Sequence, residues 1–485
     1  MALVVWPGVR LSAQCPDGSP PPCARPAHSA APSPNSVAVL YLDNLSRDTA
    51  DAFLADGLTE EIIIRLGQVQ RLAVKSRFEV LRFRGRTAVL DPTGLGSTLN
   101  AAYLVTGSVQ RAGDRVRLRV ALVRSATRAQ VWGDIIDRAS SDLLTIESEI
   151  ALEVAAAITG QLLPEERSRL SRPLTSDPIA YEEYLRGLRA LNNSHDEALR
   201  GALAHFDRAI ERDSGFAAAY AGQAVAWVYL ADAYVPPRDG LKRARDAARQ
   251  AIARDSSQAI AYAVLGSAVL ALDLDAREAE RLARRAVALD PHGGWPRWSL
   301  SFALYAAGRV EESISEAGRA WQSDSLGGYG FWYAKVLVRG HHFNSATALL
   351  PRFRAIMSPS EVDPIEGLLL ATRGDLRAAE HLLSWRFYGG EVAVMYVRAL
   401  LARGDTLAAR ATIDSMLAAR TPDYYNPVAL AGAFAALGDI DRGMEWLQRA
   451  FEERTAWVFW VRLDDELAPL RADPRYAALD RQLRY

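Results

Sequence analysis

Residues 259–291 constrain the fold most, because small and apolar residues recur in this stretch at helical spacing. The residues that carry the spacing are Tyr262, Leu265, Gly266, Val269, Ala279, Ala283, Ala286 and Pro291. Small side chains let two helices approach closely, and a proline ends the second helix because it cannot continue the hydrogen-bond ladder. The stretch therefore predicts a pair of antiparallel helices. Such a pair cannot bury its apolar face alone, so neighbouring pairs must stack on both sides.

The same spacing recurs over residues 177–485 at intervals of 30 to 42 residues. The equivalent positions on the second helix of each pair are Ala209, Ala251, Ala286, Ala320, Phe353, Arg386, Met416 and Ala450. The longest interval contains an extended turn at Ala231–Gly240. Glycines recur at the turn within a pair, where the C-terminal end of a helix favours glycine. They are Gly308, Gly374, Gly404 and Gly438.

This pattern resembles the tetratricopeptide repeat (TPR), a family of helical hairpins. The resemblance implies an all-α TPR superhelix, a helical solenoid, with about eight hairpins over residues 177–452. Residues 453–485 contain a run of apolar and aromatic residues and then Asp473-Pro474-Arg475-Tyr476, which resembles the closing motif of such arrays. We expect a capping segment there, with a binding tail as the alternative.

Residues 36–162 have a different pattern, which predicts an α/β domain in front of the helical array. The expected strands are Val37–Leu42, Leu72–Lys75, Tyr103–Val109, Arg115–Val123 and Gln130–Asp137, and the expected helices are Asp51–Leu66, Leu95–Ala101 and Leu143–Leu163. Apolar and charged residues alternate in the strand at 115–123, as in a half-exposed strand.

The order of these segments resembles the TolB-like N-terminal domain that bacteria place before TPR arrays, most sharply at Leu58-Thr59-Glu60-Glu61 and Gly107-Ser108-Val109. In that family the domain often follows a kinase, a DNA-binding winged helix or a cyclase, and this sequence contains no motif of these. The resemblance implies a structural role for Glu60 and Glu61 within their helix.

Residues 1–35 are expected to form a truncated signal peptide and a Pro/Ser-rich linker. A short apolar run precedes a possible cleavage position after Ala13. Cys15 and Cys23 flank a proline-rich loop, which favours either a disulfide in an oxidising compartment or two unrelated thiols. We therefore expect a periplasmic or otherwise exported protein, with a cytoplasmic protein as the alternative.

An aromatic stripe is the strongest candidate for a binding site. Trp295, Trp298, Phe302 and Tyr305 lie on one helical face, and Trp332 follows in the next first helix. In the repeat register this face is the one that resembles the concave, ligand-lining face of the family. Aromatic residues often anchor protein interfaces. The alternative is that the rings pack on neighbouring helices.

Composition and motifs do not support other classes of function. Lys and Arg number 57 and Asp and Glu 58, so there is no basic excess for nucleic acid. No apolar run has the length of a transmembrane span. Gly94-Leu95-Gly96 lacks the rest of a nucleotide loop, and His341-His342 lacks further ligands at metal spacing. The sequence therefore predicts no catalytic residues, no cofactor and no metal.

Three hypotheses follow. The first is a non-enzymatic scaffold in the cell envelope whose concave face binds a peptide or helix of a partner protein, while the α/β domain docks on a partner or on the chain's own repeats. The second is a cytoplasmic regulatory module that works with a separate kinase or adenylate cyclase. The third is an unrecognised small-molecule site in the α/β domain, near Asp43, Asn44 and Asp56.

Overall fold

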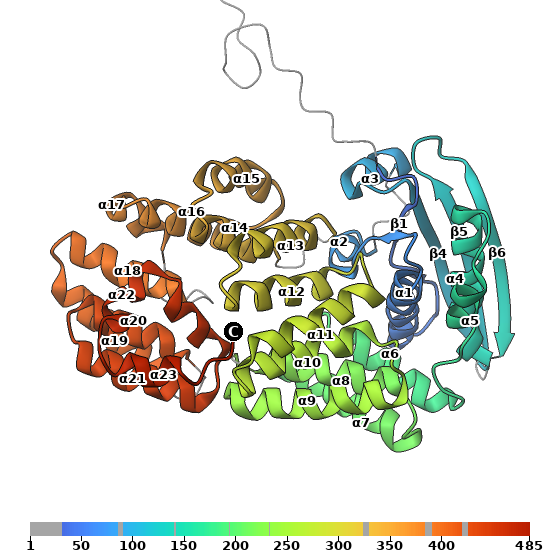
Figure 1. The fold of residues 1–485 in the computed structure, drawn as a ribbon. Coiled ribbons are helices and arrows are strands. Elements are labelled where there is room, and N and C mark those ends of the chain that lie inside the picture. Colours follow the sequence, from blue (N-terminus) through green and yellow to red (C-terminus); the bar gives the residue numbers. More distant parts are fainter. Residues whose placement is uncertain are drawn as a thin grey trace, which may run out of the picture.

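The computed structural model describes residues 32–85, 91–139, 142–193, 195–231, 233–323, 329–383, 390–419 and 425–485. The expected leader and the Cys15–Cys23 pair lie outside these residues. A small sheet with its own helices comes first, and a long curved array of helices follows it (Figure 1). The expected fold class, an α/β N-terminal domain and an all-α TPR-like solenoid, is confirmed.

The sheet has the strand order β3-β1-β4-β5-β6, with β2 paired to β4. Its strands are β1 (Ser36–Val39), β2 (Asp43–Asn44), β3 (Ala73–Val74), β4 (Tyr103–Ala112), β5 (Arg115–Arg124) and β6 (Gln130–Ala139). β1 runs parallel to β3 and β4, whereas β4, β5 and β6 form an antiparallel meander. Exposed and buried residues alternate along most of β5, which confirms the half-exposed strand.

Helices cover both faces of this sheet. Val37 and Val39 of β1 contribute to the core shared with α1 (Ala52–Gly67) and α4 (Leu143–Thr159), whereas Ala38 and Leu40 pack with residues of α2 (Arg77–Leu81) and α3 (Pro92–Leu99). Gly94-Leu95-Gly96 lies in α3, where a Cβ on Gly96 would lie 2.2 Å from the Ser125 side chain. This glycine therefore serves close packing.

The array begins after α5 (Pro164–Leu170) and consists, in the described residues, of helices that pack as eight consecutive pairs. The pairs are α6 (Pro178–Ala190) with α7 (Asp196–Arg212), α8 (Ala217–Leu230) with α9 (Pro237–Arg254), α10 (Ala259–Leu272) with α11 (Ala276–Leu289), α12 (Gly294–Ala306) with α13 (Val310–Ser323), α14 (Tyr329–Arg339) with α15 (Phe343–Ile356), α16 (Pro359–Thr372) with α17 (Leu376–Ala379) and η4 (Glu380–Leu382), α18 (Gly390–Ala402) with α19 (Thr406–Ala419), and α20 (Pro427–Ala436) with α21 (Ile440–Glu453).

The repeat register read from the sequence matches this structure. The predicted second-helix positions, apart from Arg386, which lies outside the described residues, are all fully buried in second helices: Ala209, Ala251, Ala286, Ala320, Phe353, Met416 and Ala450. The four predicted turn glycines have positive φ angles, from 78° at Gly308 to 94° at Gly374. A glycine adopts this left-handed backbone without the steric cost of a Cβ.

The C-terminal segment returns to the middle of the array. It contains η5 (Ala456–Arg462), η6 (Asp465–Leu467), α22 (Ala468–Arg471) and α23 (Tyr476–Asp480). It packs on α20 and α21, as a cap does, but near its end the Arg484 N–H also donates to the Leu274 carbonyl, and the Ala276 N–H donates to the Arg484 carbonyl, both at 2.7 Å. Figure 1 accordingly shows the C-terminus beside the α10–α12 region. The array is thus closed on itself, which a simple cap does not require.

Candidate functional site

The predicted stripe forms a continuous ladder of rings, which we call the aromatic ladder: Tyr229, Trp295, Trp298, Phe302 and Trp460. Successive ring centroids along it are 5.3, 6.1, 5.1 and 4.6 Å apart. These are ordinary separations for interacting aromatic pairs. The sequence predicted three of its members, but Trp460 comes from the C-terminal segment. Helical periodicity within one hairpin gives no signal for so distant a contact.

Two of the five predicted anchors do not line an open surface. Tyr305 is fully buried and Trp332 is 6% exposed, because the Trp460 ring lies against both, at 5.3 and 5.8 Å. The Tyr305 hydroxyl donates to Asp464 at 2.8 Å, and the Trp332 indole N–H donates to the Ser301 hydroxyl at 2.8 Å. Tyr305 and Trp332 therefore follow the alternative interpretation of the aromatic stripe, in which the rings pack on neighbouring elements.

The other three anchors keep part of their surface. Trp295, Trp298 and Phe302 are each half-buried, on successive turns of α12. The repeat register predicts that Arg297, Leu300, Ser301 and Leu304 face the core. Leu300, Ser301 and Leu304 are buried, whereas Arg297 is half-buried and pairs with Glu316. The accessible part of the aromatic ladder is therefore Trp295, Trp298 and Phe302, whereas Trp460 covers the far end of this face of α12.

Ionic contacts hold the covering segment in place. Arg339 of α14 pairs with Asp464, with its Nε 3.3 Å from Oδ1, and with Glu466, with its Nη1 2.7 Å from Oε2. All three side chains are at most 4% exposed. Burial alone would lower the pKa of Arg339, but the two carboxylates hold this pKa above its usual range. Lys335, one turn earlier, lies 4.5 Å from the Trp457 ring centroid and 5.1 Å from that of Trp460.

Glu60 and Glu61 of α1 lie at the junction between the α/β domain and the array. Glu60 accepts hydrogen bonds from the Tyr41 hydroxyl at 2.8 Å and from the Asn192 amide at 2.6 Å, and it pairs with Arg77 at 3.1 Å. Glu61 accepts from the Tyr184 hydroxyl of α6 at 3.0 Å. Glu60 thus has partners in both the α/β domain and the array, and Glu61 bonds directly to α6 of the array. This supports the structural role expected for both residues.

A buried cluster with unequal charge lies behind this junction. Arg65 is within 3.1 Å of both Glu61 and Glu147, and all three side chains are at most 1% exposed. Burial raises the pKa of Glu61 and raises that of Glu147 to about 8. One arginine cannot balance two desolvated carboxylates, so the cluster favours the uptake of one proton.

The polar residues suggested for a site in the α/β domain do not form one. Asp56 is 2% exposed and pairs with Arg84 and, at 3.0 Å, with Arg189 of α6. Burial raises its pKa. Asp43 and Asn44 form the short strand β2 beside β4. Asp56 therefore belongs to the contact between α1 and the array.

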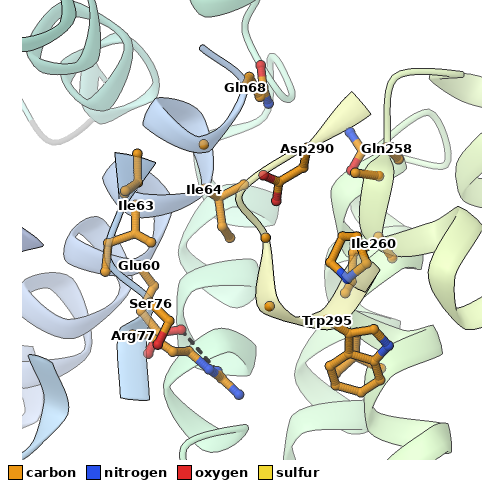
Figure 2. A pocket seen from close by; sticks show the side chains of 18 of the residues that line it. Glu60, Ile63, Ile64, Gln68, Ser76, Arg77, Gln258, Ile260, Asp290 and Trp295 are labelled. Carbon is orange, nitrogen blue, oxygen red and sulfur yellow. Dashed lines mark hydrogen bonds and ion pairs between the residues drawn. The ribbon is translucent and has the colours of Figure 1, made fainter. Parts of the chain in front are cut away.

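A cavity of about 290 Å³ lies between α1 and the first helices α6, α8, α10 and α12 (Figure 2). Its lining includes Ile63 and Ile64 of α1, Ile260 of α10, Asp290 and Trp295. The aromatic ladder therefore begins in this cavity. Sequence reasoning selected Trp295 but missed the cavity, because its two walls are more than 100 residues apart in the sequence and only the docking of α1 brings them together.

Neither a metal-binding cluster nor a membrane-crossing helix is found among the described residues. No group of three or more His, Cys, Asp and Glu side chains in that part of the chain is arranged to hold a metal ion. None of the helices seen there combines the length and apolar character that a bilayer crossing needs.

No family model matches the chain. A curated relative, named putative adenylate cyclase 3 of Rhizobium meliloti (strain 1021), is 29% identical over 241 residues, which are 49% of this chain and 41% of the relative. The chain thus spans about two fifths of the length of that relative.

Similar solved structures include YrrB, described as a TPR protein with an unusual peptide-binding site (17% identity, 42% of this chain and 97% of that chain, TM-score 0.29). Yeast Tom70 is similar over 62% of this chain and 67% of its own (16% identity, TM-score 0.37). A tetratricopeptide repeat protein from Parabacteroides merdae ATCC 43184 is similar over 53% and 98% (10% identity, TM-score 0.35). The assignment of a helical-hairpin array rests on the chain's own helices and register.

Proposed function

We propose that this chain is a non-enzymatic scaffold whose helical array binds a peptide or helix of a partner protein. The observation that carries the proposal is the accessible part of the aromatic ladder at Trp295, Trp298 and Phe302. Half-buried aromatic rings on a rigid helix supply apolar contact area at little entropic cost. Tyr305 and Trp332 are buried and pack against rings of the aromatic ladder, Tyr305 against Trp460 and Trp332 against Phe302.

The test is crosslinking in native cells followed by measurement of affinity with the purified partner. A Trp298→Ala variant removes the central ring of the accessible part, and we expect its dissociation constant to rise at least tenfold, as for a hot-spot residue. Trp446→Ala is the matched control, because Trp446 is also a half-buried tryptophan but lies on α21 of the last helix pair and is not a member of the aromatic ladder. Equal affinities of wild type and Trp298→Ala would refute the proposal.

A second candidate function is regulation of a separately encoded nucleotide cyclase or kinase in the cytoplasm. The curated relative with the name of an adenylate cyclase favours it, although the match covers only 41% of that relative. An assay of purified protein with ATP and Mg²⁺ for cyclic AMP separates the possibilities. We expect no product from this chain alone. Product formation by the chain would make it an enzyme, and product only after addition of a cyclase partner would favour the regulatory module.

The envelope location remains part of the first proposal and rests on residues 1–35 alone. Sequencing of the mature N-terminus from fractionated cells, together with thiol labelling of Cys15 and Cys23, tests it. Cleavage after Ala13 and labelling only after reduction are expected for an exported protein. An intact N-terminus with two free thiols would favour the cytoplasmic alternative.

A further inference from the structure

The cavity of about 290 Å³ has apolar walls from both parts of the chain. Ile64 of α1 is 44% exposed although it lines this cavity, and Ile260 and Trp295 lie on the opposite wall (Figure 2). The volume is about that of ten water molecules in the liquid and falls near the lower end of ligand sites. A small molecule in this space would remove apolar surface of α1 and of the array from water together.

Most charged groups of the lining already have partners. Glu60 pairs with Arg77 at 3.1 Å, and Glu61 pairs with Arg65 at 3.1 Å. These acids also accept the hydroxyl and amide hydrogen bonds that join α1 to its neighbours. They are committed to the domain junction and are poor candidates for contact with a ligand.

Asp290, between α11 and α12, differs from them. Among the described residues no Lys or Arg lies within ion-pair distance of its carboxylate, and the nearby Arg297 pairs instead with Glu316 at 2.6 Å. The carboxylate accepts the backbone N–H groups of His292 and Gly293. Figure 2 shows it pointing toward the space beside Ile64. Burial raises the pKa of Asp290 to about 6, so it is mostly ionised at neutral pH.

We propose that this cavity binds a small apolar amine, with its ammonium group paired to Asp290 and its body against Ile64, Ile260 and Trp295. An ammonium supplies the positive charge that the lining lacks at Asp290, and the indole face of Trp295 favours a cation or an aromatic ring nearby. Because the ligand contacts α1 and the repeats together, its binding stabilises the junction between the two parts. The site shares Trp295 with the accessible part of the aromatic ladder but does not include Trp298, the residue changed in the peptide-binding test.

Three probes with one indole body and different charge test the proposal on the full chain: tryptamine, tryptophol and indole-3-acetate. Calorimetry measures affinity and a thermal melt measures stabilisation. We expect tryptamine to bind on the order of tenfold more tightly than tryptophol, as a charge-assisted hydrogen bond gives, and to raise the melting temperature. Indole-3-acetate should bind more weakly than both. No detectable binding of tryptamine, or equal binding of the anion, would overturn the proposal.

Matched variants locate the site. Asp290→Asn keeps an oxygen for the two backbone N–H groups and should equalise tryptamine and tryptophol, whereas Asp114→Asn, in the exposed β4–β5 turn, should change nothing. Ala218→Leu, which fills the cavity from α8, should abolish binding of all three probes. If Asp290→Asn does not fold, Ile64→Lys decides: Ile64→Lys and Ile64→Gln both lose the apolar contact, but only the added cation should weaken tryptamine binding more than tryptophol binding. If the variants still bind tryptamine more tightly than tryptophol, the ammonium group does not pair with Asp290 and the proposal is wrong.

Discussion

The closure of the array by its C-terminal segment depends on Arg339. This arginine is 4% exposed and faces two carboxylates, Asp464 and Glu466, that are 2% and 1% exposed. An Arg339→Met variant keeps the aliphatic length but leaves both carboxylates buried without a counter-charge. Breaking a buried pair in this way costs about 3–5 kcal/mol, because the remaining charge has lost its water and its partner. The presence of two carboxylates puts the expected loss at the upper end of this range.

The assay is urea unfolding followed by circular dichroism, with limited proteolysis of the native state as a second measurement. We expect a lower midpoint for Arg339→Met and faster cleavage after residue 453, since the segment from there onward loses its anchor. Arg475→Met is the control, because Arg475 is 50% exposed and its pair with Asp441 is screened by solvent. Exposed pairs contribute about 0–1 kcal/mol.

A double change offers a sharper criterion. Asp464→Asn with Glu466→Gln, added to Arg339→Met, removes the uncompensated charges and should recover most of the lost stability. If Arg339→Met costs less than about 1 kcal/mol, or if the added neutral residues recover nothing, then the charges do not hold the segment and the reasoning is wrong.

Two further predictions concern α1 and the cluster behind it. A Cβ at Gly57 would lie 2.6 Å from the Leu185 Cβ, so Gly57→Ala should cost about 1–3 kcal/mol in thermal unfolding, whereas Gly67→Ala, with nothing within 4 Å, should be neutral or slightly stabilising. The pKa of Glu147 is raised to about 8 from 4.5 by burial, so its protonated form favours the folded state. The contribution of Glu147 to the free energy of unfolding should be largest below about pH 4.5 and fall by roughly 5 kcal/mol between about pH 4.5 and 8. Glu147→Gln should flatten this dependence, and an unchanged pH profile would count against the cluster.

The repeat array could be predicted from sequence because its determinants are local. Small residues such as Ala286 recur at a fixed period, and Gly308 lies where a left-handed turn is needed, so neither depends on distant contacts. The strand at β5 was predictable for the same reason, since alternation alone specifies its two faces. Strand lengths were less predictable, and the segment expected at Val37–Leu42 pairs as β1 only to Val39.

The site could be predicted only in part because its residues meet through long-range packing. The helical period placed Trp298 and Tyr305 on one face of α12, but it could not show that Trp460 lies across the end of that face. The exposure of Tyr305 is decided by Trp460, which lies 155 residues further along the chain. In the same way the sequence could not show that Asp290 lines a cavity, because α1 supplies the opposite wall.

The α/β domain and the first hairpins share one core, which leads to a final prediction. A single cluster of buried apolar residues runs from Val37 of β1 to Val264 of α10. α1 lies inside it, with Phe53 under the guanidinium of Arg186, 3.7 Å from the ring centroid, and Glu61 bonded to Tyr184. A fragment of residues 32–171 would therefore expose the α6-facing side of α1 and leave Glu61 without its hydroxyl donor.

We expect that fragment to bind a hydrophobic dye and to unfold without a cooperative transition, because an exposed apolar face and an unsatisfied buried acid both oppose folding. A fragment of residues 32–212 restores the first hairpin and should unfold cooperatively. The comparison isolates the contribution of α6 and α7, since the sheet and its helices are identical in both fragments. Cooperative unfolding of the shorter fragment with unchanged stability would show that the shared core is not required by the α/β domain, and would make the array a neighbour rather than a part of the same folding unit.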